Sequence, residues 1–371
     1  MSSRKILLLY ISEISGHRSA ALAIERALRE IEPSTDVVGI NAFRYTNPIT
    51  EKLVHNIYMN VIQKMPKIWE YLYDNPKVVS KIGIFKKIAH KINAPKLEKL
   101  IDAVKPDVIA CTQAYPCGMV ADYKAVYKSD IPLVAVLTDY VPHAYWVYDL
   151  VDHYVVPSEE VALRLKNKGV DGAKIKVFGI PFDPKFNQPV DKLKVYRKLN
   201  FSPDVPTVLI MGGGHGLGPV REIIERLDQL KSSIQEIIIC GSNKKLYNSL
   251  QQIVGRCKKK NALFAFTDEV NELMSISDIL ITKPGGITTA EALTKNLPMI
   301  IVKPIPGQEA NNSDYLTSCG AAIRLNDLAD LTGLVDGLLQ DKKSLESLRK
   351  SANFISKPQS SADIAKLLLG I

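Results

Sequence analysis

The strongest structural signal in the chain is the sequence Ile279-Leu-Ile-Thr-Lys-Pro-Gly-Gly-Ile-Thr-Thr-Ala-Glu291. Its apolar start, Ile279–Ile281, is typical of a buried parallel strand, and the residues after the two glycines are typical of a helix. A tight glycine turn between strand and helix directs free backbone N–H groups toward an anion. A second unit of this kind follows, where Met299–Val302 precedes Pro306-Gly-Gln-Glu-Ala-Asn-Asn312.

Glu291 lies about one turn inside the first of these helices, where a carboxylate can reach a ribose hydroxyl. The two strand–turn–helix motifs together therefore predict a site for a nucleoside diphosphate with its ribose. A structural alternative exists, because Thr288-x-x-Glu291 also has the form of a capping box, in which the carboxylate serves only its own helix.

Length and composition set the broad class. The chain has 371 residues, 46% of them hydrophobic, which is enough for two domains with separate cores. No apolar run approaches the ~18 residues of a membrane-spanning helix, and the run near the start is too short for a signal peptide. The cysteines lack C-x-x-C spacing, which favours reduced thiols in a cytoplasmic protein and offers no zinc framework. They are Cys111, Cys117, Cys240, Cys257 and Cys319.

The net charge of +9 is concentrated in residues 41–100, where eleven Lys and Arg residues outnumber four Asp and Glu residues. Seven aromatic residues are interleaved with these charges. Such a mixture suits an anionic bilayer surface. One alternative is a solvated helical face over an ordinary core. Nucleic acid would also attract the charge, but no nucleic-acid motif accompanies it, so we expect no such partner.

Strands and helices alternate along the chain, which predicts α/β domains with parallel, doubly wound sheets. The expected strands are 5–11, 36–41, 107–111, 133–138, 153–157 and 174–179, then 207–211, 236–240, 263–266, 279–281 and 299–302. Gly179–Phe186 carries two prolines and is expected to connect a first domain, 1–186, to a second, 187–371. The last helix is a candidate to pack back on the first domain. Ligands of such domains bind at the carboxyl ends of the strands.

The glycine loop Gly212-Gly-Gly-His-Gly-Leu-Gly218 invites comparison with a dinucleotide-binding turn. An NAD site also needs an acidic residue at the end of the next strand, and here that strand ends in Cys240-Gly-Ser242. We therefore expect the loop to bring backbone close to the phosphates or sugar of a smaller ligand. A purely structural turn is the alternative.

His17 follows the first expected strand and lies at the amino end of the next helix. The helix dipole there disfavours the imidazolium and lowers the pKa of the imidazole. A neutral imidazole at the carboxyl edge of a sheet can act as a general base on a hydroxyl group. A capping or solvent-facing histidine is the alternative.

The order of these motifs resembles the monogalactosyldiacylglycerol synthase and processive diacylglycerol glucosyltransferase family over nearly the whole chain. The matching motifs are Gly16-His-Arg-Ser-Ala-Ala21, Thr138-Asp-Tyr140 with His143, Trp146 and Val151-Asp152, Gly179-Ile-Pro181, the loop 212–218, Lys283-Pro-Gly-Gly-Ile-Thr288 with Glu291, and Pro306-Gly-Gln-Glu309. The first motif follows Glu13-Ile-Ser15 and is poorer in glycine than in many members. The resemblance implies the GT-B fold, two Rossmann-like doubly wound domains facing a cleft.

The resemblance also implies roles for single residues. His17 would be the catalytic base, with Asp139 in support. Glu291 would bind the ribose, and Thr267 and Val270 would lie near the uracil. The whole set expected around the donor is Gly213, Gly214, Ser242, Thr267, Val270, Lys283, Gly285, Gly286, Ile287, Thr288, Glu291, Gln308 and Glu309. Those expected at the acceptor and the membrane are Trp69, Tyr71, Lys86, Lys87, His143 and Trp146. His215 receives no role.

The implied activity is an inverting transfer of a hexose from a UDP-sugar to diacylglycerol or a glycosyldiacylglycerol, by a protein peripheral on the inner face of the cell membrane. Lys283-Pro-Gly-Gly286 favours glucose. No cofactor is obligatory, since the UDP-sugar is a substrate, and no metal is expected, since the chain lacks a D-x-D pair. The alternatives are a galactosyltransferase on the same acceptor, a peptidoglycan N-acetylglucosaminyltransferase, a UDP-sugar 2-epimerase and a non-catalytic binder of anionic lipid.

Overall fold

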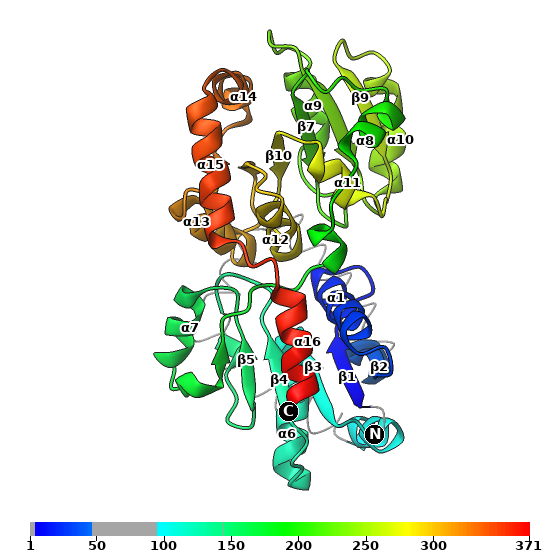
Figure 1. The fold of residues 1–371 in the computed structure, drawn as a ribbon, viewed down its shortest axis with the longest axis vertical. Coiled ribbons are helices and arrows are strands. Elements are labelled where there is room, and N and C mark those ends of the chain that lie inside the picture. Colours follow the sequence, from blue (N-terminus) through cyan, green and yellow to red (C-terminus); the bar gives the residue numbers. More distant parts are fainter. Residues whose placement is uncertain (1–3, 47–94, 143) are drawn as a thin grey trace. The chain divides into compact units, whose positions relative to one another are not determined.

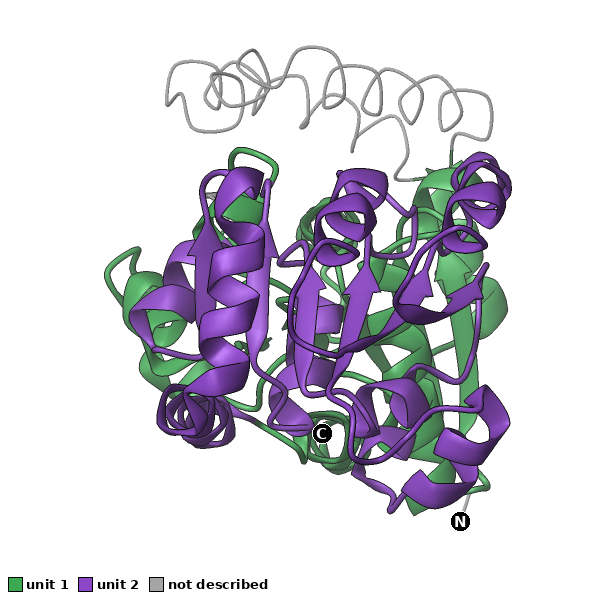
Figure 2. Ribbon diagram, turned by 90° about the horizontal axis from the view of Figure 1, so that it is seen from above, with its two compact units in different colours: residues 1–184, 305–311, 357–371 green, residues 185–304, 312–356 purple. Residues whose placement is uncertain are grey.

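The computed structural model describes residues 4–142, except 47–94, and residues 144–371 (Figure 1). The chain forms two compact units (Figure 2). Unit 1 contains residues 1–184, 305–311 and 357–371, and unit 2 contains residues 185–304 and 312–356. Four of the residues expected at the membrane or acceptor, Trp69, Tyr71, Lys86 and Lys87, lie outside the described residues, as does His143.

Unit 1 is built on a six-stranded parallel sheet with the strand order β2-β1-β3-β4-β5-β6. The strands are β1 (Lys5–Tyr10), β2 (Asp36–Asn41), β3 (Val108–Cys111), β4 (Leu133–Val136), β5 (His153–Val155) and β6 (Ile175–Lys176). Both faces of this sheet are covered, which explains the continuous apolar runs of its strands. In β1, Leu7 and Leu9 enter the core that contains Cys117 and Val120, while Ile6 and Leu8 enter the core on the opposite face.

Helices of unit 1 supply these two cores. They are α1 (Gly16–Ile31), α2 (Ala42–Thr46), α6 (Ala114–Tyr127), α7 (Glu159–Lys166) and α16 (Ser360–Gly370), with short 3₁₀ turns η1 (Ala144–Trp146) and η2 (Gly172–Lys174). The last helix, α16, packs beside α1 (Figure 1), where Ile364 and Leu368 share a core with Ile24 and Leu28. Arg4 Nη1 donates to the Leu369 carbonyl oxygen at 2.7 Å.

Unit 2 contains a second six-stranded parallel sheet, with the order β12-β11-β10-β7-β8-β9. Its strands are β7 (Thr207–Met211), β8 (Gln235–Ile239), β9 (Lys260–Phe264), β10 (Ile279–Thr282), β11 (Met299–Val302) and β12 (Ala322–Leu325). Its helices are α8 (Lys192–Leu199), α9 (Val220–Leu227), α10 (Lys244–Val254), α11 (Val270–Ser275), α12 (Gly286–Thr294), α14 (Leu331–Gln340) and α15 (Lys342–Ile355), with η4 (Leu328–Asp330). The turn η3 (Pro184–Asn187) and helix α13 (Gln308–Ser318) each include residues of both units.

The two sheets confirm the predicted α/β architecture, while three details of the strand prediction were wrong. The strand expected at 263–266 is β9, which begins at Lys260 and ends at Phe264, where it pairs with Ile239. Phe266 lies beyond it and is 68% exposed. The strand expected at 174–179 pairs only through Ile175 and Lys176. Strand β12 was missed, because its four residues include a charged Arg324 and give a weak apolar signal.

No helix within the described part of the chain combines the length and the apolar character that crossing a membrane requires.

Candidate active site

His17 lies in the first turn of α1, the helix that follows β1 after a short loop. Ser15 is the N-cap, and its hydroxyl accepts a hydrogen bond from the Arg18 backbone N–H at 3.2 Å and donates to the Ile11 carbonyl at 2.8 Å. The cap fixes where the helix begins and thus where the imidazole is placed.

Two neighbouring strands supply the partners of the imidazole. His17 Nδ1 lies 2.8 Å from the Thr112 carbonyl oxygen, one residue beyond β3, and 3.1 Å from Thr138 Oγ1, two residues beyond β4. The Thr112 hydroxyl returns a hydrogen bond to the His17 carbonyl at 2.8 Å. Because a carbonyl oxygen only accepts, Nδ1 carries the proton and Nε2 is the basic nitrogen.

Burial lowers the pKa of His17 below its usual value, and the charge of Asp139 and the hydrogen bond to Thr112 oppose this shift. The direction agrees with the prediction, but burial, not the helix dipole, is the principal cause. A neutral imidazole at neutral pH is the form that a general base requires.

Asp139 lies beside this histidine and also contacts the segment 305–311. Thr138 Oγ1 lies 3.5 Å from Asp139 Oδ2, and Gln308 Nε2 donates to the same carboxylate oxygen. Glu309, the neighbour of Gln308, accepts a hydrogen bond from the Ile305 N–H at 2.8 Å, so its carboxylate holds the turn before α13. Unit 1 therefore brings His17, Asp139 and Gln308 together.

Trp146 does not lie at a surface. Its side chain is only 7% exposed and belongs to the core of unit 1, together with Tyr154 and Val156. Trp146 is thus a core residue of unit 1, and its expected role at the acceptor or the membrane stays a prediction.

In unit 2, the glycine loop 212–218 follows β7 and interlocks with the turn after β8. Both the backbone N–H and the hydroxyl of Ser242 donate to the Gly214 carbonyl at 2.9 Å. Gly216 has a φ of +56°, and a Cβ there would lie 2.0 Å from the Cys240 carbonyl oxygen. Only glycine fits so close an approach. The expected Gly214 and Ser242 are thus in direct contact.

The loop after β10 presents a helix start that no side chain caps. The N-cap of α12 is Gly285, which has no side chain to satisfy the first N–H groups of the helix. Gly286, Ile287 and Thr288 form the first turn, so their amides are directed at the space before the helix, as an anion site requires. Thr288 is inside the helix, so the capping-box alternative was wrong.

Other predicted donor residues also belong to unit 2. Lys283 is buried, and its side-chain carbons lie 3.6 Å from where a Cβ of Gly218 would be. Burial raises the pKa of Glu291 to about 8, and the charge of Lys185 opposes that shift. Thr267 lies in the loop between β9 and α11, with its hydroxyl accepting from the Glu269 N–H at 3.2 Å, and Val270 begins α11.

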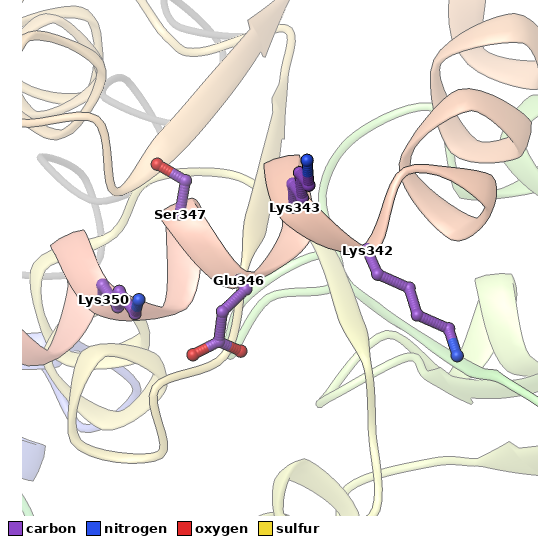
Figure 3. A pocket seen from close by; sticks show the side chains of 5 residues that line it. All are labelled: Lys342, Lys343, Glu346, Ser347 and Lys350. Atoms are coloured by element: carbon purple, nitrogen blue, oxygen red, sulfur yellow. The ribbon is translucent and has the colours of Figure 1, made fainter.

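A separate hollow of about 400 Å³ lies along α15, lined among the described residues by Lys342, Lys343, Glu346, Ser347 and Lys350 (Figure 3). These side chains all come from one helix, and none of them was predicted to bind donor or acceptor. The hollow is therefore not part of the predicted site.

Sequence reasoning missed Thr112 and Lys185 as site residues. Thr112 follows the buried strand β3 directly, which is a position where parallel sheets place functional side chains. Lys185 lies in the connector, where only the prolines were noticed.

Known proteins resemble this chain in sequence and in fold. Residues 17–182 match the family model of monogalactosyldiacylglycerol (MGDG) synthase, and residues 207–368 match that of the glycosyltransferase family 28 C-terminal domain. The chain is 32% identical to the processive diacylglycerol beta-glucosyltransferase of Bacillus pumilus, covering 98% of this chain and 94% of that protein. It is 30% identical to the protein of the same name from Bacillus subtilis, with coverages of 99% and 95%.

Two solved structures share the fold. MurG of Acinetobacter baumannii superposes with a TM-score of 0.69 at 15% identity, covering 99% of this chain and all of MurG. HepE of Anabaena, solved in complex with UDP-glucose, gives a TM-score of 0.56 at 14% identity, covering 99% of this chain and 100% of that one.

Two Rossmann-like parallel sheets with these loops at their strand ends give the GT-B fold. The matched family models and relatives make the chain a glycosyltransferase of this fold. The chain belongs to the family of monogalactosyldiacylglycerol synthases and processive diacylglycerol beta-glucosyltransferases, as the sequence motifs predicted.

Proposed function

We propose that this protein transfers a hexose, with glucose favoured, from a UDP-sugar to diacylglycerol or a glycosyldiacylglycerol, with inversion at the anomeric carbon. Relatives named diacylglycerol beta-glucosyltransferases support the acceptor and the sugar. A structural neighbour that holds UDP-glucose supports the donor. The observation that carries the mechanism is the hydrogen bond from His17 Nδ1 to the Thr112 carbonyl.

In this mechanism, His17 Nε2 removes the proton of the lipid hydroxyl. The oxygen forms a bond to the anomeric carbon from the face opposite UDP, and the bond from that carbon to the diphosphate oxygen breaks, with its electron pair leaving on UDP. The imidazolium that forms is stabilised by the Thr112 carbonyl at Nδ1 and by the nearby charge of Asp139.

The donor is bound in unit 2. The amides at the start of α12 and the glycine loop 212–218 meet the negative charge that grows on the diphosphate. Glu291 accepts from the ribose hydroxyls, and Thr267 and Val270 contact the uracil. Gln308 binds a hydroxyl of the donor sugar, in exchange for its present contact with Asp139.

The protein acts as a peripheral protein on the inner face of the cell membrane. The lipid acceptor and the basic, aromatic composition of residues 41–100 support this location.

The test is an assay with diacylglycerol vesicles and UDP-glucose, UDP-galactose or UDP-N-acetylglucosamine in turn. Glucolipid and an equal amount of free UDP are expected with UDP-glucose. Preferred use of UDP-galactose would reassign the sugar, and an epimerised nucleotide sugar without any glycolipid would overturn the transferase assignment.

A further inference from the structure

The turn η3 is fixed to the loop that precedes α11. Lys185 Nζ donates to the Asp268 carbonyl at 2.6 Å, and Asn271 Nδ2 donates to the Lys185 carbonyl at 3.0 Å. Asn271 is only 4% exposed, so the second hydrogen bond is made away from water. The side-chain ammonium and the backbone carbonyl of Lys185 are thus both bound to the segment that carries Thr267 and Val270.

The same turn also contacts the residue that ends α12. Phe186 is 3% exposed, and the Lys295 ammonium lies 5.9 Å from the centre of its ring. Lys295 follows Glu291 by one helical turn, on the same side of α12. η3 therefore contacts both the segment that carries Thr267 and Val270 and the residue that follows the helix of Glu291.

The charge of Lys185 also affects the pKa of Glu291. Burial raises the pKa of the Glu291 carboxyl, and Lys185 is the charge that opposes this. Burial lowers the pKa of Lys295; the charge of Glu272 on α11 opposes this shift, and the charge of Lys192 on α8 adds to it.

We propose that Lys185 is a positioning residue for the nucleoside half of the donor: its ammonium and its carbonyl hold the segment 267–271, which carries Thr267 and Val270. This inference rests on the proposed donor site. Lys185 need not touch the donor, since it acts through Asp268 and Glu291.

Because the charge of Lys185 also opposes the raised pKa of Glu291, UDP binding should depend on pH in a way that Lys185 modifies. A carboxylate accepts hydrogen bonds from both ribose hydroxyls, whereas a protonated carboxyl loses part of that capacity. Removing the lysine charge makes Glu291 harder to ionise, so UDP binding should weaken at neutral pH and recover as the pH rises.

The test is calorimetric titration of UDP and of inorganic pyrophosphate into the full chain, at pH 6.5 to 9, for wild type and Lys185→Met. UDP affinity of Lys185→Met should fall about tenfold at pH 7, the scale of one lost charge interaction, with a smaller loss at pH 9. Pyrophosphate affinity should not change, because that probe has no ribose or base. Lys185→Arg should restore UDP binding at pH 7.

Lys194→Met on α8 is the matched control, since Lys194 is exposed, and it should bind UDP like wild type. If Lys185→Met does not fold, Lys185→Gln carries the same expectation. An equal loss for pyrophosphate would overturn the inference, as would unchanged UDP affinity. Failure of the wild-type protein to bind UDP at all would instead overturn the proposed donor site.

Discussion

His17 Nδ1 lies 2.8 Å from the carbonyl oxygen of Thr112, although the two residues are 95 positions apart. This contact fixes the tautomer of the imidazole, because the carbonyl can bind only the protonated nitrogen. Nε2 is then the nitrogen that can accept a proton. The adjacency of β1 and β3 in the sheet creates the pair.

Replacing His17 with alanine tests the base assignment. Transfer to diacylglycerol should fall by about 10²–10⁴-fold, the range of general base catalysis, while UDP affinity stays unchanged. Glycolipid formation and calorimetric UDP binding provide the two measurements. Near-normal turnover in the variant would show that another group removes the proton.

The pH dependence of transfer should identify the titrating group. Burial lowers the pKa of His17 and Asp139 raises it, so removing the Asp139 charge should lower that pKa further. The base is active when neutral, so the rate rises with pH through this pKa. The acidic limb of kcat/KM should therefore move to lower pH in Asp139→Asn. An acidic limb that stays in place, or moves to higher pH, would show that the charge of Asp139 does not raise the pKa of His17.

The glycine loop gives a prediction about stability. A Cβ at Gly216 would lie 2.0 Å from the Cys240 carbonyl, whereas one at Gly213 would meet nothing within 4 Å, and both residues have positive φ. Gly213→Ala should cost about 1 kcal/mol of unfolding free energy, the penalty of the left-handed backbone alone. Gly216→Ala should cost more, on the order of 2–4 kcal/mol, since the clash adds to that penalty. Urea unfolding of the two variants measures the difference, and equal losses would contradict the packing that the structure shows.

Glu236 on β8 predicts how stability changes with pH. It is fully buried, and neither carboxyl oxygen has a hydrogen-bond partner in the described structure. Burial raises its pKa to about 8, with Asp228 adding to the shift and Lys259 opposing it. The folded state holds this proton more tightly than the unfolded chain does. The contribution of the protonated carboxyl to the unfolding free energy is therefore fully present below pH 4.5, and it is lost as the pH rises through about 8.

Glu236→Gln should remove that loss, because an amide does not ionise. At pH 9 the variant should be more stable than wild type, on the order of 1–3 kcal/mol, with little difference at pH 5. Thermal unfolding at the two pH values provides the comparison. A wild-type melting temperature that does not fall between pH 5 and pH 9 would show that ionisation of the Glu236 carboxyl does not destabilise the folded state.

The sequence by itself determined the features that depend on near neighbours. The apolar run Ile279–Ile281 followed by Gly285 and Gly286 predicts strand, turn and helix, because backbone sterics and hydrogen bonding are settled within a few residues. The order of the motifs along the chain likewise predicted the family. The limits of β9 were missed, since pairing with β8 ends that strand.

Only the tertiary structure decided which distant residues meet. Thr112 faces His17 because β3 pairs with β1, and Lys185 reaches Asp268 because η3 packs against the loop before α11. The sequence pattern near each residue does not predict either contact. Both depend on how whole elements pack, as when α16 packs against α1 to form one core. The chemistry of each residue was readable from its type, but its partner was set by the fold.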